Sequence, residues 1–121
     1  MGRVKTLVVG ASTNPERYAY KAIEKLSMHK HELIALGLRT GKVLGHTIAT
    51  EKLQWKDIDT VSLYLGPARQ EPYFDYILSL KPRRVLFNPG TENPVFESLL
   101  KAKGILVERA CTLVLLATNQ Y

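Results

Sequence analysis

The chain has 121 residues, of which 45% are hydrophobic, and carries a formal net charge of +6 at pH 7. This length predicts one domain with a continuous core, and no apolar stretch approaches the roughly 20 residues of a membrane span, so we expect no membrane contact. The positive charge fits either an anionic ligand or an ordinary solvated surface. Arg and Lys are scattered without interleaved aromatic residues, which disfavours nucleic acid.

The first element is a short apolar run at residues 4–9, whose β-branched residues predict a strand that is buried on both faces. The run stops at Gly10, which suits a tight turn. A helix follows, capped either by Thr13, with Glu16 completing a Thr-x-x-Glu box, or by Asn14. A glycine turn that leads into the free N–H groups of a helix predicts an anion site.

Strands and helices then alternate along the chain. We expect strands at residues 32–37, 60–66, 84–88 and 105–108. We expect a first helix that ends near residues 28–30, and further helices at 69–81 and from 93 to about 103. Residues 38–50 are expected to form a loop with a short extended piece, 53–57 one helical turn, and 112–118 a short helix or, alternatively, a strand. This alternation predicts an α/β fold, a single doubly wound parallel sheet of about five strands with helices on both faces.

In such a sheet, ligands bind beyond the carboxyl ends of the strands. The turns expected there all contain Gly or Pro; they are Gly10 to Thr13, Gly37 to Arg39, Gly66-Pro67 and Asn88 to Gly90. Short connections need Gly and Pro in any case, but several such turns together favour a binding edge. The first turn lacks the further glycines of a dinucleotide fingerprint and the lysine of a Walker A loop. Arg39, where a NAD site carries an acidic residue, favours a phosphate on the ribose.

Four segments resemble one known family. They are Val8-Val-Gly-Ala-Ser-Thr-Asn-Pro-Glu-Arg17, Val43-Leu-Gly45, Phe87-Asn-Pro-Gly90 and Gly104-Ile-Leu-Val107 leading to Cys111. Together they resemble the coenzyme A-binding domain family, Rossmann-like proteins similar to the N-terminal domain of succinyl-CoA synthetase α subunits. The chain departs from it at residues 35–39, where many members have a Pro-Val-Asn-like segment, and in an extra residue before Cys111.

The resemblance implies that residues 1–121 form a single domain that binds coenzyme A or an acyl-CoA. In this interpretation Gly10, Ala11, Ser12 and Thr13 hold the pyrophosphate with Arg17, while Arg39, after Gly37 and Leu38, meets the ribose phosphate. The adenine or pantetheine would lie against Leu65, Gly66, Pro67, Asn88, Pro89 and Gly90. Phosphates need backbone N–H donors and one or two cations, which these residues supply.

Little in the sequence suggests catalysis or a metal site. His29 and His31 lie at a helix end, whereas His46 is expected nearer the ligand edge, and Glu92 follows a strand-end turn. Cys111 is expected to be a core thiol rather than a redox partner of the ligand's thiol; as the one cysteine it allows no internal disulfide, which fits a reducing cytoplasm. A non-catalytic carrier, sensor or regulator is therefore expected. The alternatives are an NADP-dependent or acyl-CoA-transforming enzyme that uses His46 or Glu92, and a protein- or nucleic-acid-interaction module. A homo-oligomer or an unknown protein partner remains open.

Overall fold

The computed structural model describes residues 4–121, and within them it contains a seven-stranded sheet of order β3-β4-β2-β1-β5-β6-β7. The parallel strands are β1 (Thr6–Val9), β2 (Leu33–Leu36), β4 (His46–Ala49), β5 (Thr60–Leu63), β6 (Arg84–Phe87) and β7 (Leu106–Arg109), and β3 (Gly41–Val43) runs antiparallel to β4. The expected parallel α/β sheet is confirmed, with two more strands than predicted.

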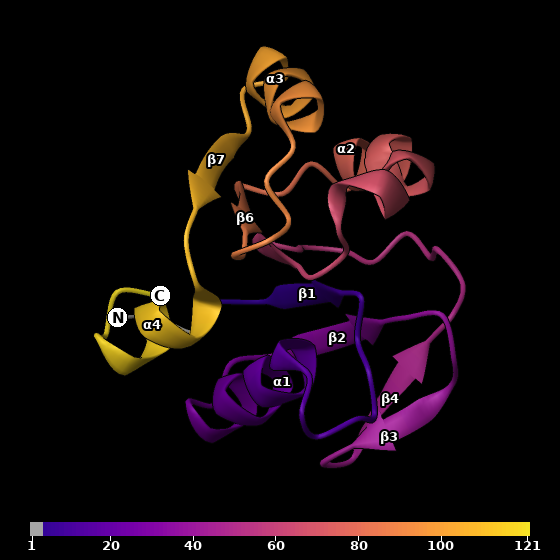
Figure 1. Ribbon diagram of the computed structural model, residues 1–121, viewed down its shortest axis with the longest axis vertical. Coiled ribbons are helices and arrows are strands. Elements are labelled where there is room, and N and C mark those ends of the chain that lie inside the picture. Colours follow the sequence, from indigo (N-terminus) through magenta and orange to yellow (C-terminus); the bar gives the residue numbers. More distant parts are fainter. Residues whose placement is uncertain (1–3) are drawn as a thin grey trace.

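Helices cover both faces of the sheet, as expected (Figure 1). Helices α1 (Tyr18–Met28) and α4 (Thr112–Ala117) lie on one face, and α2 (Phe74–Leu80) and α3 (Pro94–Ala102) lie on the other. Neighbouring residues of β1 point to opposite layers: Leu7 packs with Phe96 of α3, and Val8 packs with Ile23 of α1. All residues of β1, β5 and β6 are buried because both faces are covered. Within the described residues, no helix is both long and apolar enough to cross a membrane.

Helix α1 begins later than its sequence predicts. Its N-cap is Arg17, which makes no side-chain capping bond, so neither Thr13 nor Asn14 caps the helix. The Asn14 side chain instead accepts a hydrogen bond from the Glu16 amide at 3.0 Å, and the Arg17 amide donates to the Asn14 carbonyl. Asn competes for nearby amides in this way and forms a turn of its own. The connection from β1 to α1 is therefore a long loop rather than a tight turn.

Three other predicted segments also differ from the structure. Residues 38–50 contain the β3–β4 hairpin, whose two-residue turn, Leu44-Gly45, has positive φ at both positions. Residues 53–57 form no helical turn. The segment predicted as one helix at 69–81 contains the end of one 3₁₀ turn, η1 (Pro67–Arg69), and a second, η2 (Glu71–Tyr73), and only α2 is α-helical. Residues 112–118 contain the expected short helix.

Candidate ligand-binding site

The loop after β1 lies between the ends of its two neighbouring strands. The amides of Gly10 and Ala11 both donate to the Leu36 carbonyl at the end of β2, at 2.9 and 3.0 Å. On the other side, a Cβ on Gly10 would lie 3.1 Å from the carbonyl carbon of Tyr64, directly after β5. Because the chain leaves β1 for β2 on one side and later adds β5 on the other, this junction is the topological switch point, where open α/β sheets bind ligands.

Two glycines allow the same loop to approach the strands on the β2 side. A Cβ on Gly37 would lie 2.5 Å from the Ala11 carbonyl oxygen and 3.0 Å from Cγ2 of Ile48. A Cβ on Gly41 would lie 2.5 Å from Cγ2 of Thr13. The turn at 10–13 therefore rests directly on the turn after β2 and on the hairpin, so the structure brings two of the four predicted turns together.

The hydrogen bonds in this loop narrow the set of amides available to an anion. Those of Gly10 and Ala11 are occupied by Leu36, and the Asn14 amide donates to Oγ of Ser12 at 3.1 Å. No described residue accepts a hydrogen bond from the amide of Ser12 or Thr13. The first amides of α1, at residues 18–20, have no acceptor within the helix because of helix geometry. These two groups of N–H donors are the described amides of the loop and helix start that suit a phosphate.

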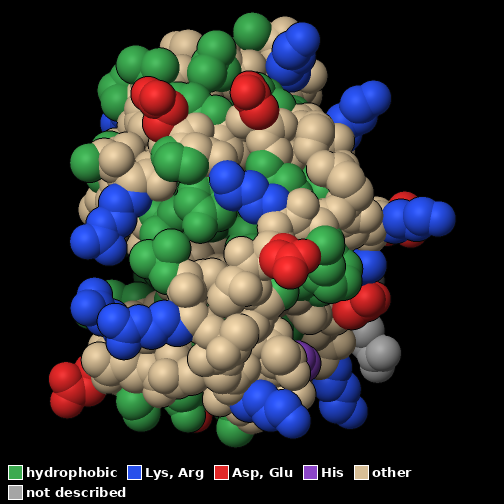
Figure 2. Space-filling view, turned by 90° about the vertical axis from the view of Figure 1, so that its right-hand side faces the viewer, with side chains coloured by type: hydrophobic (Ala, Val, Ile, Leu, Met, Phe, Trp, Pro, Cys, Tyr) green, Lys and Arg blue, Asp and Glu red, His purple; other side chains and the backbone are tan. Residues whose placement is uncertain are grey.

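Two predicted arginines are exposed, one in the loop that carries these amides and one after Gly37, which contacts Ala11. Arg17 is the N-cap of α1, and Arg39 follows Gly37 and Leu38 in a bend after β2. Leu38 is 70% exposed. Neither arginine forms an ion pair with a described residue, so both guanidinium groups are available to an anion. Figure 2 shows Lys and Arg side chains spread over one face of the molecule rather than gathered in one patch.

Asn88, predicted to line the site, is buried and fully engaged in the fold. Its Nδ2 donates to Oγ of Ser62 and to the Leu63 carbonyl, both at 3.0 Å, and its Oδ1 accepts from the Thr112 amide at 2.8 Å. The side chain thus joins β5, β6 and the beginning of α4. Pro89 and Gly90, which follow it, are exposed. Asn88 therefore positions this edge, while the two residues after it are accessible to a ligand.

Gln70 is a site-building residue that sequence reasoning missed. Its side chain is completely buried, and its Nε2 donates to the carbonyls of Leu65 at 2.9 Å and Thr91 at 2.7 Å. Its Oε1 accepts from Nδ2 of Asn93 at 3.0 Å. The residue thereby fastens the turn after β5 to the turn after β6. No local pattern singles out Gln70, because two of its three partners, Thr91 and Asn93, lie more than 20 residues away in sequence.

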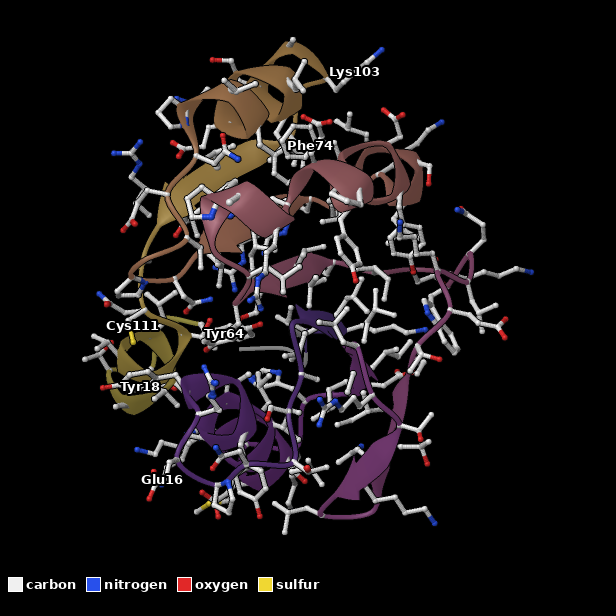
Figure 3. The ribbon with its side chains drawn as sticks, turned by 45° about the vertical axis from the view of Figure 1, so that its right-hand side comes forward. Glu16, Tyr18, Tyr64, Phe74, Lys103 and Cys111 are labelled. Atoms are coloured by element: carbon white, nitrogen blue, oxygen red, sulfur yellow. The ribbon has the colours of Figure 1, made fainter. Side chains whose placement is uncertain are left out.

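Tyr64 lies at the end of β5, and Figure 3 shows it on the same side of the molecule as Cys111, next to α4. Its hydroxyl is buried and makes no hydrogen bond to a described residue, whereas the neighbouring hydroxyls of Ser62 and Thr112 bond each other at 2.8 Å. Burial raises the pKa of Tyr64 to about 12, so the phenol is neutral at pH 7. Cys111, expected to be a core thiol, is half-buried directly before α4.

The prediction that His46 lies nearer the ligand edge is wrong. Because β4 runs parallel to β2, its first residue, His46, lies at the opposite edge of the sheet. Its Nε2 is 3.4 Å from Oγ of Ser27, near the end of α1. His31 is at that edge too, where its Nδ1 accepts from the Val4 amide. Among residues 4–121, no group of three or more His, Cys, Asp or Glu side chains could hold a metal ion.

Two grooves on the described residues lie away from the turns at the strand ends. One of about 600 Å³ lies between α1 and α4. The other, of about 460 Å³, lies between the ends of α2 and α3, next to Gly104.

Comparison with known proteins agrees with this geometry. The model of the CoA binding domain family matches residues 4–117. The chain belongs to this family. It is 46% identical to an uncharacterized protein of known crystal structure, with both chains covered completely and a TM-score of 0.98. No curated protein matches the chain.

More distant solved structures share the fold. Cell-free ID.343 from Thermus thermophilus is 20% identical, with 98% of this chain and 91% of that chain covered and a TM-score of 0.86. A hypothetical protein from Pyrococcus horikoshii is 24% identical, with 93% and 80% covered and a TM-score of 0.84. At this level of identity the likeness concerns the Rossmann-like fold alone.

Proposed function

We propose that this member of the CoA binding domain family binds coenzyme A or an acyl-CoA at the strand ends and acts in the cytoplasm as a carrier, sensor or regulator without catalysis. The observation that carries the proposal is the junction at Gly10, where the ends of β1, β2 and β5 meet at the switch point of the sheet. A free thiol, such as those of coenzyme A and Cys111, persists in a reducing compartment.

In the proposed complex, the pyrophosphate lies at the amides of Ser12 and Thr13 and the N-terminus of α1, with Arg17 beside it. Gly10 and Ala11 donate no hydrogen bond to the pyrophosphate, because their amides already donate to the Leu36 carbonyl. They contribute only to the shape of the loop. Arg39 meets the 3′-phosphate. The pantetheine arm crosses the turns at residues 65–67 and 89–90, which Gln70 and Asn88 hold in place.

Absence of catalysis is proposed from the groups at this edge. The Tyr64 phenol is neutral at pH 7. Glu92 is held in its own turn, where its Oε1 accepts from the Gly90 amide at 3.0 Å. The histidine expected here, His46, lies at the opposite edge. None of these three groups is therefore proposed as a general base for a bound thioester.

Isothermal titration with coenzyme A, acetyl-CoA and NADPH tests the proposal. We expect coenzyme A and acetyl-CoA to bind and NADPH to bind much more weakly, because the junction lacks the further glycines of a dinucleotide site. Binding of NADPH with no heat from either CoA species would contradict the proposal. Turnover of acetyl-CoA by the purified protein would contradict the non-catalytic role alone.

A further inference from the structure

The groove between α1 and α4 has no role in the site described above. It lies on one face of the sheet, between two helices that contact each other (Figure 1). Its lining consists of Pro15, Tyr20, Lys21, Glu24, Lys25, His29, Leu113, Leu116 and Ala117. The α4 side is entirely apolar, while the charged side chains come from α1. Its volume of about 600 Å³ is within the range of small-molecule sites.

One end of the groove opens at the proposed ligand edge. Pro15 belongs to the loop between β1 and α1, and Leu113 is in the first turn of α4, directly after Thr112, whose amide donates to Asn88. The other end is marked by His29, which follows α1. The groove thus extends along α1, a helix of 11 residues and so roughly 16 Å long. Figure 3 shows Tyr18, at the beginning of α1, beside α4.

In the proposed complex, the pantetheine arm would run towards this end of the groove. From the amides of Ser12 and Thr13, the arm would pass the turn after β5 and reach the beginning of α4. Thr112 is buried there, with its amide on Asn88 and its hydroxyl on Ser62. The next residue, Leu113, already lines the groove. A thioester held at this point would direct its acyl chain between the two helices.

We propose that the groove between α1 and α4 holds the acyl chain of a medium- or long-chain acyl-CoA, an inference that rests on the proposed function. A hydrocarbon chain needs no hydrogen-bond partner, and burial against Leu113, Leu116 and Ala117 favours it over water. A groove as long as α1 suits a chain of this kind and would be mostly unfilled by an acetyl group.

Titration of the wild-type protein with coenzyme A, acetyl-CoA, octanoyl-CoA and dodecanoyl-CoA, below their micelle concentrations, tests the inference. We expect the affinity to rise with chain length, by about tenfold or more from acetyl-CoA to dodecanoyl-CoA, because each buried methylene adds to binding. Equal affinity across the series would overturn the acyl groove and leave the proposed function standing. No binding of coenzyme A or of any thioester would instead contradict the proposed function.

A matched pair of substitutions tests whether the acyl chain of the ligand lies in this groove. Ala117→Trp fills the groove, while Ala102→Trp adds the same side chain on the exposed side of α3; both alanines are exposed, so folding is expected to persist. Ala117→Trp should abolish the increase in affinity with acyl-chain length and leave the affinity for coenzyme A unchanged. Ala102→Trp should change neither of these. If the affinity of Ala117→Trp still increases with acyl-chain length, the inference is wrong. Dodecanoic acid that binds as tightly as dodecanoyl-CoA would also overturn it.

Discussion

Gly37 illustrates how one absent Cβ shapes this edge of the sheet. In the structure the Ala11 carbonyl occupies the space that a side chain at position 37 would need. Its place after a strand predicts that Gly37 is a turn residue, and the structure adds a second reason for glycine, a close contact with the loop after β1. Gly66, which is predicted to be a turn residue on the same grounds, has open space around its Cβ position and a negative φ.

Substitution by alanine should therefore have different effects on stability at Gly37 and at Gly66. Gly37→Ala should destabilise the protein by about 1–3 kcal/mol, because the new methyl group displaces backbone rather than a flexible side chain. Gly66→Ala should be neutral or stabilise by up to about 1 kcal/mol, since alanine restricts the unfolded chain. Urea unfolding monitored by circular dichroism measures both. Equal stability of the two variants would contradict the close contact at Gly37.

Arg17 and Arg39 are proposed to meet different phosphates, and dephospho-CoA, which lacks the 3′-phosphate, separates them. Arg39→Ala should weaken coenzyme A binding by about 1–3 kcal/mol and leave dephospho-CoA binding unchanged. Arg17→Ala should weaken both ligands alike, because both contain the pyrophosphate. Lys101→Ala, an exposed change on α3, is the control. If Arg39→Ala weakens both ligands equally, the assignment of Arg39 to the 3′-phosphate is wrong.

Among the elements, the helix faces follow closely from sequence, whereas the helix starts and the hairpin do not. The spacing of Ala19, Ala22, Ile23 and Leu26 predicts the buried face of α1, and all four are buried. The start of α1 was not predictable, since Thr13 and Asn14 are both good capping residues and only the local hydrogen bonds distinguish a turn from a cap. The hairpin was obscured because Leu44 occupies a turn position usually held by Asn or Gly.

The turn of the β3–β4 hairpin can be tested by substitution of Leu44. Leu44 is 56% exposed and has a φ of 49°, a left-handed conformation that leucine disfavours and asparagine tolerates. Leu44→Asn should therefore raise the free energy of unfolding by about 0.5–1 kcal/mol by creating an Asn-Gly turn. Leu53→Asn, at a similarly exposed leucine without positive φ, should bring no gain. Thermal unfolding compares the two, and a destabilised Leu44→Asn variant would contradict the turn geometry.

At the scale of the whole molecule, two buried tyrosines make the free energy of unfolding depend on pH in the alkaline range. Burial raises the pKa of both Tyr64 and Tyr121 to about 12, from an ordinary value of 10. A raised pKa in the folded state means that the stabilising contribution is complete below pH 10 and is lost as the pH rises towards 12. We therefore expect the free energy of unfolding to fall over this range, as measured by urea titration at successive pH values.

Substitution by phenylalanine separates the two tyrosines. Tyr64→Phe removes a buried hydroxyl without a described partner, so stability at pH 7 should be equal or higher and the alkaline loss smaller. Tyr121→Phe should cost about 1 kcal/mol at pH 7, because it breaks the 2.6 Å hydrogen bond between Tyr121 and Thr6. Exposed Tyr18→Phe is the control. An unchanged alkaline loss in both buried variants would contradict their raised pKa values.

The residue pattern along the chain predicts the succession of buried strands and amphipathic helices, and hence a parallel sheet covered on both faces. These features depend on the periodicity of neighbouring residues, which local chemistry controls. The tertiary structure alone decided that Gly37 touches the loop after β1, that Gln70 joins two turns, and that His46 lies at the far edge. Each depends on strand order and on contacts between residues far apart in the chain, which no local pattern encodes.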